Sequence, residues 1–239
     1  MTAIETPASH KTFHEKLDLL KQRLLDMSQL AEDLLATSVQ SFLRRDAVKA
    51  ETVTPADAEV DLLEVEIEQL AISLLALQQP MARDLRFIVS AIRISGDLER
   101  VGDHAVNIAQ SALRMVDLRS GVTPPPEIAE MAHRSRKMLS DALDAVVRLD
   151  GALGRDVCRR DDEVDELHES VFRILLTHMM EDQSTISAAL ELLLVSRNLE
   201  RVADLATNVA EDAVYLAEGK TIKHHLEDRP ASTVPQLHV

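Results

Sequence analysis

The stretch DLERVGDHAVNIA (residues 97–109) returns later in the chain as NLERVADLATNVA (residues 198–210). Each copy places a Glu and an Asp four residues apart: Glu99 and Asp103 in the first, Glu200 and Asp204 in the second. Residues four apart are neighbours on one face of a helix, so each copy predicts two adjacent carboxylates within an otherwise apolar helical pattern. The repeat therefore indicates a chain built from two similar halves, each with its own carboxylate pair.

The composition favours an all-α protein. The 239 residues include 6 Gly, no Trp and 2% aromatic residues, whereas hydrophobic residues make up 46%. β-Sheet proteins usually need more aromatic and turn-forming residues, and long stretches rich in Leu, Ala and Glu favour helices. A chain of this length can bury one large core or two smaller ones.

Apolar residues at three- and four-residue steps predict six helices. The first spans about residues 11–45, the second runs from Thr54 to a break at Pro80, and the third continues to about residue 118. The other three span about residues 127–153, 161–180 and 185–217. Thr54 suits the N-cap of the second helix, because Pro55 after it suits a first helical turn.

Two further features divide the chain into halves. The segment DAEVD (residues 57–61) at the start of the second helix matches DDEVD (residues 161–165) at the start of the fifth. The segment SGVTPPP (residues 120–126) cannot continue a helix and therefore marks the boundary. We expect two pseudo-symmetric antiparallel three-helix bundles and a mobile C-terminal tail, in residues 1–122, 123–219 and 220–239.

The charge and the termini restrict the partners and the compartment. A net charge of −15 opposes binding to nucleic acid and attracts cations. Cys158 is the single cysteine, which excludes an internal disulfide and fits a reducing compartment; we expect it to be a structural thiol. The N-terminus lacks the apolar core of a signal peptide, and no run of about 18 apolar residues occurs. We expect a cytoplasmic protein that binds no nucleic acid.

The carboxylate pairs extend into rows of oxygen-bearing side chains. Asn107 lies four residues after Asp103, and Asn208 lies four residues after Asp204. Desolvating two like charges without a partner is costly, and a cation is the simplest compensation. Carboxylate and amide oxygens suit Mg²⁺, Mn²⁺ or Ca²⁺, and carboxylate clusters also hold iron. The rows therefore predict a metal site in each half.

The neighbouring helices offer further acids, and both sets of acids have alternative roles. Further ligands could come from the second and fifth helices: Asp57 and Asp61, Asp161 and Asp165. The first acid of each of these pairs could instead cap its helix. The acids of the repeat could instead form ion pairs at a three-residue step, Arg100 with Asp103 and Arg201 with Asp204. The repetition of Glu-Arg-Val-x-Asp favours the metal interpretation.

A second function class is a carboxylate-bridged di-metal enzyme. Glu130-x-x-His133 and Asp165-x-x-His168 have the Glu-x-x-His spacing that such helical-bundle enzymes use. Those enzymes combine two such pairs with two further Glu in one bundle, and the first half of this chain has no matching pair. No zinc-protease, phosphate-loop or nucleophile-elbow motif occurs in the sequence. A protein that is not an enzyme is the leading interpretation.

The repeated segments resemble the PhoU family of regulatory proteins of bacterial phosphate uptake. The segment ISGDLERVGDHAVNIA (residues 94–109) is similar to the most recognisable stretch of that family, and NLERVADLATNVAE (residues 198–211) to its counterpart in the second half. The resemblance covers about residues 13–218. Its second copy departs from the first where Asn198, Ala203 and Leu205 replace Asp97, Gly102 and His104, and no proposed ligand is lost.

The resemblance implies metal clusters at the Glu/Asp-x-x-x-Asp motifs of two three-helix bundles. The implied ligands are Asp57, Asp61, Glu99, Asp103, Asp161, Asp165, Glu200 and Asp204, with Asn107 and Asn208 as additional polar ligands. The implied cofactors are divalent or trivalent metal ions: iron, manganese, magnesium or zinc.

The resemblance also implies a signalling role. Members of the family repress the phosphate-starvation response when phosphate is ample, as adaptors between the high-affinity phosphate ABC transporter and a membrane sensor histidine kinase. Contact with the membrane would then be peripheral and made through these protein partners. Exposed helix faces lead us to expect a homodimer.

Overall fold

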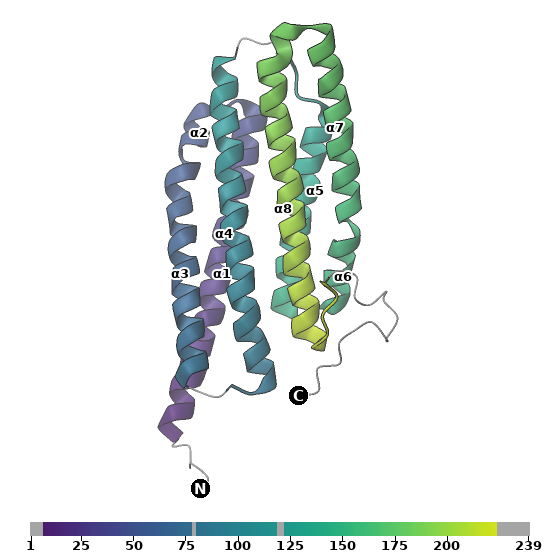
Figure 1. The fold of residues 1–239 in the computed structure, drawn as a ribbon. Helices are drawn as coiled ribbons and strands as arrows, with labels where there is room; N and C mark the ends of the chain where they lie inside the picture. Colours follow the sequence, from purple (N-terminus) through teal and green to yellow (C-terminus); the bar gives the residue numbers. More distant parts are fainter. Residues whose placement is uncertain (1–6, 78–79, 119–121, 224–239) are drawn as a thin grey trace.

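The computed structural model describes residues 7–77, 80–118 and 122–223, and within these residues all regular structure is helical (Figure 1). Six long helices form the fold: α1 (Pro7–Arg44), α3 (Val53–Leu77), α4 (Ala82–Asp117), α5 (Pro126–Arg148), α7 (Asp161–Glu181) and α8 (Ile186–Glu218). Shorter elements lie between them: α2 (Ala47–Glu51), α6 (Gly151–Arg159) and the 3-10 helix η1 (Gln183–Thr185). The all-α prediction with six long helices is confirmed.

The long helices form two three-helix bundles that pack against each other. Helices α1, α3 and α4 contact one another in the first bundle, and α5, α7 and α8 do so in the second. Helices α3, α4, α8 and α7 lie side by side in one layer, with α1 and α5 behind it (Figure 1). The predicted boundary falls between α4 and α5. Residues 120 and 121 of it lie outside the described residues, as do residues 224–239 of the predicted tail.

Helices α4 and α8 meet in an antiparallel seam between the bundles. Arg93 contacts the carboxylate of Asp212 at 3.0 Å, and Arg114 contacts Glu191 at 2.8 Å, so the numbers rise along one helix as they fall along the other. The Asp212 side chain is fully buried, so its ion pair with Arg93 compensates a charge that would be costly to bury alone. The seam therefore joins the bundles through polar pairs as well as apolar packing.

The repeated Leu-Glu-Arg-Val segment contributes both buried core residues and polar surface residues to each half. Leu98 and Val101 are fully buried in α4, and Leu199 and Val202 are buried in the same way in α8. Burying each such side chain contributes about 1.5–3 kcal/mol. Glu99 and Glu200 are displaced by about 100° around the helix from the leucines that precede them. The core packing therefore directs both glutamates away from the apolar interior.

Two predicted helix ends are wrong for identifiable reasons. Thr54 is not an N-cap, because α3 begins at Val53, whose side chain is fully buried. The predicted helix of residues 127–153 ends at Arg148, because Leu149 adopts a left-handed conformation with φ 54°. Asp150 is the N-cap of α6, and its carboxylate accepts the backbone N–H groups of Ala152 and Leu153.

The α6–α8 contact requires a glycine. A Cβ atom built on Gly154 would lie 2.8 Å from the carbonyl oxygen of Ala210 and 3.0 Å from a methyl group of Val214. A Cβ atom on Gly96 in α4 would instead lie 3.6 Å from the nearest atom, a side-chain oxygen of Glu64. A backbone carbonyl cannot move aside as a flexible side chain can, so an added methyl group should be tolerated at Gly96 but not at Gly154.

We expect Gly154→Ala to lower the free energy of unfolding by about 1–3 kcal/mol through overpacking. Gly96→Ala, its matched control, should raise it by about 0.5–1 kcal/mol, because alanine is the better helix former. Urea unfolding followed by circular dichroism measures both. Equal effects of the two substitutions would contradict the close α6–α8 contact.

Candidate metal centres

The first-half cluster consists of five acids on α3 and α4: Asp57, Asp61, Glu64, Glu99 and Asp103. The charges of Asp61 and Asp103 act on Asp57, and those of Asp103, Glu64 and Asp61 act on Glu99, so the two helices bring the five side chains together. Gly102 makes room for this approach, because a Cβ atom there would collide with Oδ1 of Asp57.

Burial and like charge disfavour ionisation in the first-half cluster. The pKa of Asp57 is raised to about 6, first by burial and then by the charges of Asp61 and Asp103. The pKa of Glu99 is raised by burial and by Asp103 and Glu64, and that of Glu64 by burial, Glu68 and Asp61. Groups that repel one another in this way gain from a shared cation.

The second-half cluster repeats the arrangement on α7 and α8. Its acids are Asp161, Asp165, Glu200 and Asp204. The pKa of Asp161 is raised to about 6, first by burial and then by the charges of Asp204 and Asp165. The pKa of Asp165 is raised by burial, then by Glu200 and Asp204. The structure therefore brings together the four predicted ligands of each half.

Two buried oxygen atoms at equivalent positions have no hydrogen-bond partner. They are Oδ1 of Asp57 and Oδ1 of Asp161; the Thr207 side chain lies beside the Asp161 carboxyl and opposes the rise in its pKa, whereas Asp57 has no such neighbour among the described residues. An oxygen that capped a helix would accept a backbone N–H, so neither atom supports the capping alternative. Buried polar atoms are rarely left without partners, and hard cations are bound by carboxylate oxygens. The donor chemistry of both clusters therefore fits a metal ion.

The ion-pair alternative holds for one predicted pair only. Arg201 contacts Asp204 at 2.9 Å, as the three-residue step predicts. Arg100 contacts Asp97 at 3.6 Å instead of Asp103, because it turns toward the seam. The first-half cluster is thus the less neutralised of the two among the residues that the structure describes.

The side chains as they stand do not converge on one point. In residues 7–77, 80–118 and 122–223, no group of three or more His, Cys, Asp or Glu side chains is placed so that it could hold a metal ion. Binding would therefore require side-chain rotations within each cluster. Asn208 donates to Asp97 across the seam at 3.5 Å, and Asn107 is exposed on α4. Their role as ligands stays a prediction.

Two members of the clusters lie outside the leading set of predicted ligands, although His168 belongs to a Glu-x-x-His-like pair of the di-metal alternative. Glu64 and His168 lie 104 positions apart, as Asp57 and Asp161 do, so they occupy matching places on α3 and α7. The Nε2 atom of His168 is 3.9 Å from Oε2 of Glu200. The offset between the repeated acidic segments was the signal in the sequence that pointed to both.

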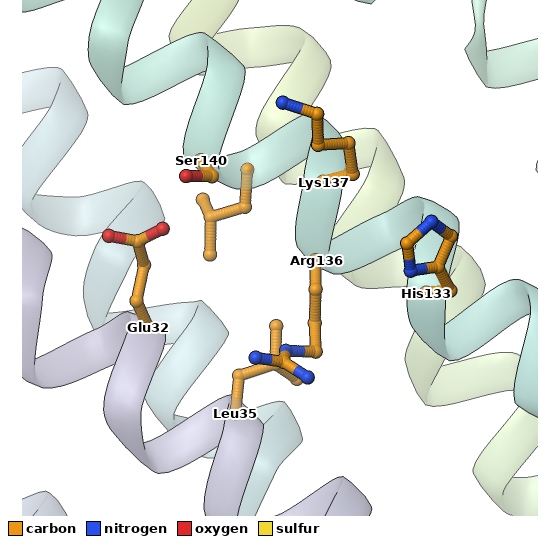
Figure 2. A pocket seen from close by; sticks show the side chains of 7 residues that line it. Glu32, Leu35, His133, Arg136, Lys137 and Ser140 are labelled. Atoms are coloured by element: carbon orange, nitrogen blue, oxygen red, sulfur yellow. The ribbon is translucent and has the colours of Figure 1, made fainter.

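The other predicted Glu-x-x-His pair lies elsewhere. Glu130 pairs with Arg134 at 2.6 Å. His133 lines a cavity of about 240 Å³ between α1 and α5, which Figure 2 shows with Glu32 and Arg136. The two pairs of the di-metal enzyme alternative therefore lie in different surroundings: Glu130 and His133 beside Arg134 and the α1–α5 cavity, and His168 beside Glu200.

The raised pKa values of Asp57 and Asp161 make the stability of the folded chain depend on pH. Asp57 and Asp161 have a pKa of about 6 in the folded chain and about 3.8 otherwise, so the folded chain binds more protons between these values. The free energy of unfolding should therefore fall as the pH rises from 4 to 6, and level off above.

In the presence of a chelator, the double variant Asp57→Asn/Asp161→Asn should flatten this slope. Urea midpoints between pH 4.5 and 7 measure it. The matched control is Asp33→Asn, an exposed acid of α1 outside both clusters. A slope that the double variant leaves as steep as in the wild type would refute the assignment of the proton uptake to these two groups.

None of the described helices is both long and apolar enough to cross a membrane. The exposed apolar side chains are instead distributed along several amphipathic helices.

Comparison with known proteins identifies the family. The sequence model of the PhoU domain matches residues 24–112 and 128–213, one segment in each bundle. A relative from Caulobacter vibrioides, named phosphate-specific transport system accessory protein PhoU homolog, is 41% identical over 84% of this chain and 87% of its own length. A relative of the same name from Aquifex aeolicus is 37% identical over 92% of this chain and 99% of its own length.

Solved structures agree with the sequence comparison. The crystal structure of PhoU from Pseudomonas aeruginosa superposes with a TM-score of 0.84 at 33% identity, over 87% of this chain and 100% of that one. The phosphate transport system regulatory protein PhoU from Streptococcus pneumoniae gives a TM-score of 0.80 at 28% identity, over 87% and 98%. With its two halves matched separately and its bundles superposed, the chain belongs to the PhoU family.

Proposed function

We propose that this protein is a regulatory accessory protein of a phosphate-specific transport system. The proposal is supported by family membership along most of the chain and by the names of the relatives from Caulobacter vibrioides and Aquifex aeolicus. The protein acts by binding and is not an enzyme.

The protein binds metal ions at the two carboxylate clusters. The observation that carries this proposal is the buried, unpartnered oxygen of Asp57 among further acids, an arrangement that recurs at the matching place of the second half around Asp161. A divalent or trivalent cation (iron, manganese, magnesium or zinc) would supply the missing partner and offset the repulsion.

The protein is a cytoplasmic adaptor between a phosphate ABC transporter and a membrane sensor histidine kinase. It represses the phosphate-starvation response when phosphate is ample. The outer helix faces offer surface for partners and for a second copy of the chain, since they carry exposed apolar side chains such as Phe172, Leu176 and Met180. Contact with the membrane is made through the protein partners.

Deletion of the gene, followed by a phosphate-starvation reporter in high phosphate, tests the regulatory role. We expect the reporter to be strongly expressed in the deletion strain and silent again when the wild-type chain is supplied. Unchanged repression in the deletion strain would refute the role.

A further inference from the structure

The two clusters differ at one position that faces the acids. On α3 this position is Glu64, whose charge acts on Glu99. On α7 the matching position is His168, whose Nε2 lies 3.9 Å from Oε2 of Glu200. Pseudo-symmetry therefore gives the first half five carboxylates and the second half four carboxylates and an imidazole.

The contacts of His168 place Nδ1 at Ser196 and leave Nε2 facing the acids. Ser196 is fully buried, and its hydroxyl donates to the sulfur of Met131 at 3.3 Å. The same hydroxyl oxygen lies 2.8 Å from Nδ1 of His168 and can accept its N–H. A neutral imidazole held in this way has its lone pair on Nε2, the nitrogen that faces Glu200. Metal-ligating histidines commonly have such a partner on the other nitrogen.

The distance from His168 to Glu200 leaves room for an ion between them. At 3.9 Å it is too long for a hydrogen bond. Two ligands bound tetrahedrally at the usual Zn–N and Zn–O lengths would lie about 3.3 Å apart. A small side-chain rotation would therefore bring both onto one cation.

We propose that the two halves select different metals, with His168 as a ligand in the second half. This inference rests on the proposed binding of cations by the clusters. Imidazole suits borderline cations such as Zn²⁺, whereas an all-carboxylate set suits hard cations such as Mn²⁺. The second-half cluster takes the borderline cation, and the first-half cluster, with Glu64, takes the hard one.

Calorimetric titration of the full chain with Zn²⁺ and with Mn²⁺ tests this selectivity. The wild type should show one tighter Zn²⁺ site, and His168→Gln should weaken it at least about tenfold, the loss that removal of even an outer-shell partner causes. Ser196→Ala should weaken it by about tenfold for the same reason. His133→Gln, on α5, is the matched control and should leave Zn²⁺ binding unchanged.

An exchange of the two residues sharpens the test. Glu64→His should give the first half a tighter Zn²⁺ site, and His168→Glu should remove that of the second half while Mn²⁺ binding is kept. Nitrogen NMR of the imidazoles should show one Nε2 signal that shifts with Zn²⁺ and is lost in His168→Gln. Circular dichroism checks that each variant is folded.

The outcomes separate this inference from the proposal on which it rests. Wild-type protein that binds neither cation overturns both. Wild-type protein that binds Zn²⁺ with an affinity that His168→Gln and His168→Glu leave unchanged overturns only the role of His168, and the carboxylate sites stand.

Discussion

Addition of Mn²⁺ at about 100 times its dissociation constant is expected to raise the free energy of unfolding by about 2.7 kcal/mol for each occupied cluster. For a chain of this size, that corresponds to an increase of about 5–11 °C in Tm per cluster. The increase arises because the ion binds the acids only where folding brings two helices together. Thermal unfolding followed by circular dichroism, with and without Mn²⁺, measures it.

A charge-reducing variant should abolish this stabilisation. Its four substitutions are in the repeated segments: Glu99→Gln, Asp103→Asn, Glu200→Gln and Asp204→Asn. Without Mn²⁺ the variant should be at least as stable as the wild type, because the repulsion that raises the pKa values of Asp57 and Asp161 is weaker.

A control variant needs the same change in net charge outside the clusters. Four exposed acids provide it: Asp18→Asn, Asp33→Asn, Asp144→Asn and Asp156→Asn. This control should respond to Mn²⁺ as the wild type does. An equal increase in Tm for the charge-reducing variant would show that Mn²⁺ binds elsewhere.

Leu98→Ala and Leu199→Ala are each expected to lower the free energy of unfolding by about 2–5 kcal/mol. Both leucines are buried at matching places in the two bundles, and each substitution removes three buried carbons. The Tm should fall by about 4–20 °C in each case. Differential scanning calorimetry measures the decrease.

Both leucine variants should unfold in a single transition. Helices α4 and α8 pack along the seam that contains the buried Asp212 carboxylate, so loss of one bundle exposes the other. Leu62→Ala, on the exposed face of α3, is the control and should change the stability by less than about 0.5 kcal/mol. If Leu98→Ala unfolded in two transitions, with the second at the temperature of the wild type, the bundles would unfold independently.

Much of the fold could be predicted because local signals agree with the final packing. The three- and four-residue spacing of apolar residues predicts α4 and α8, and the same residues, among them Leu98 and Leu199, are buried in the core. The end of α5 could not be predicted, since Leu149 in a left-handed conformation has no residue signal of the kind that glycine gives. The ion pair of Arg93 with the buried carboxylate of Asp212 joins residues 119 positions apart, and no local sequence pattern predicts it.

The candidate sites were predictable to a similar extent. The internal repeat predicted the acids of α4 and α8, and the second repeat at residues 57–61 and 161–165 predicted their partners. The structure brings these acids together, and cation binding by them stays a prediction. The contribution of His168 depends on Ser196 and Glu200 of another helix, so sequence spacing alone could not assign its ring nitrogens.

Metal stoichiometry in variants of one cluster tests the central claim most directly. Equilibrium dialysis against Mn²⁺ and Zn²⁺, followed by elemental analysis, should give bound metal in both halves of the wild-type chain. Glu99→Gln/Asp103→Asn should keep only the metal of the second half, Glu200→Gln/Asp204→Asn only that of the first, and the fourfold variant none. A fourfold variant that retains as much metal as the wild type would contradict the account.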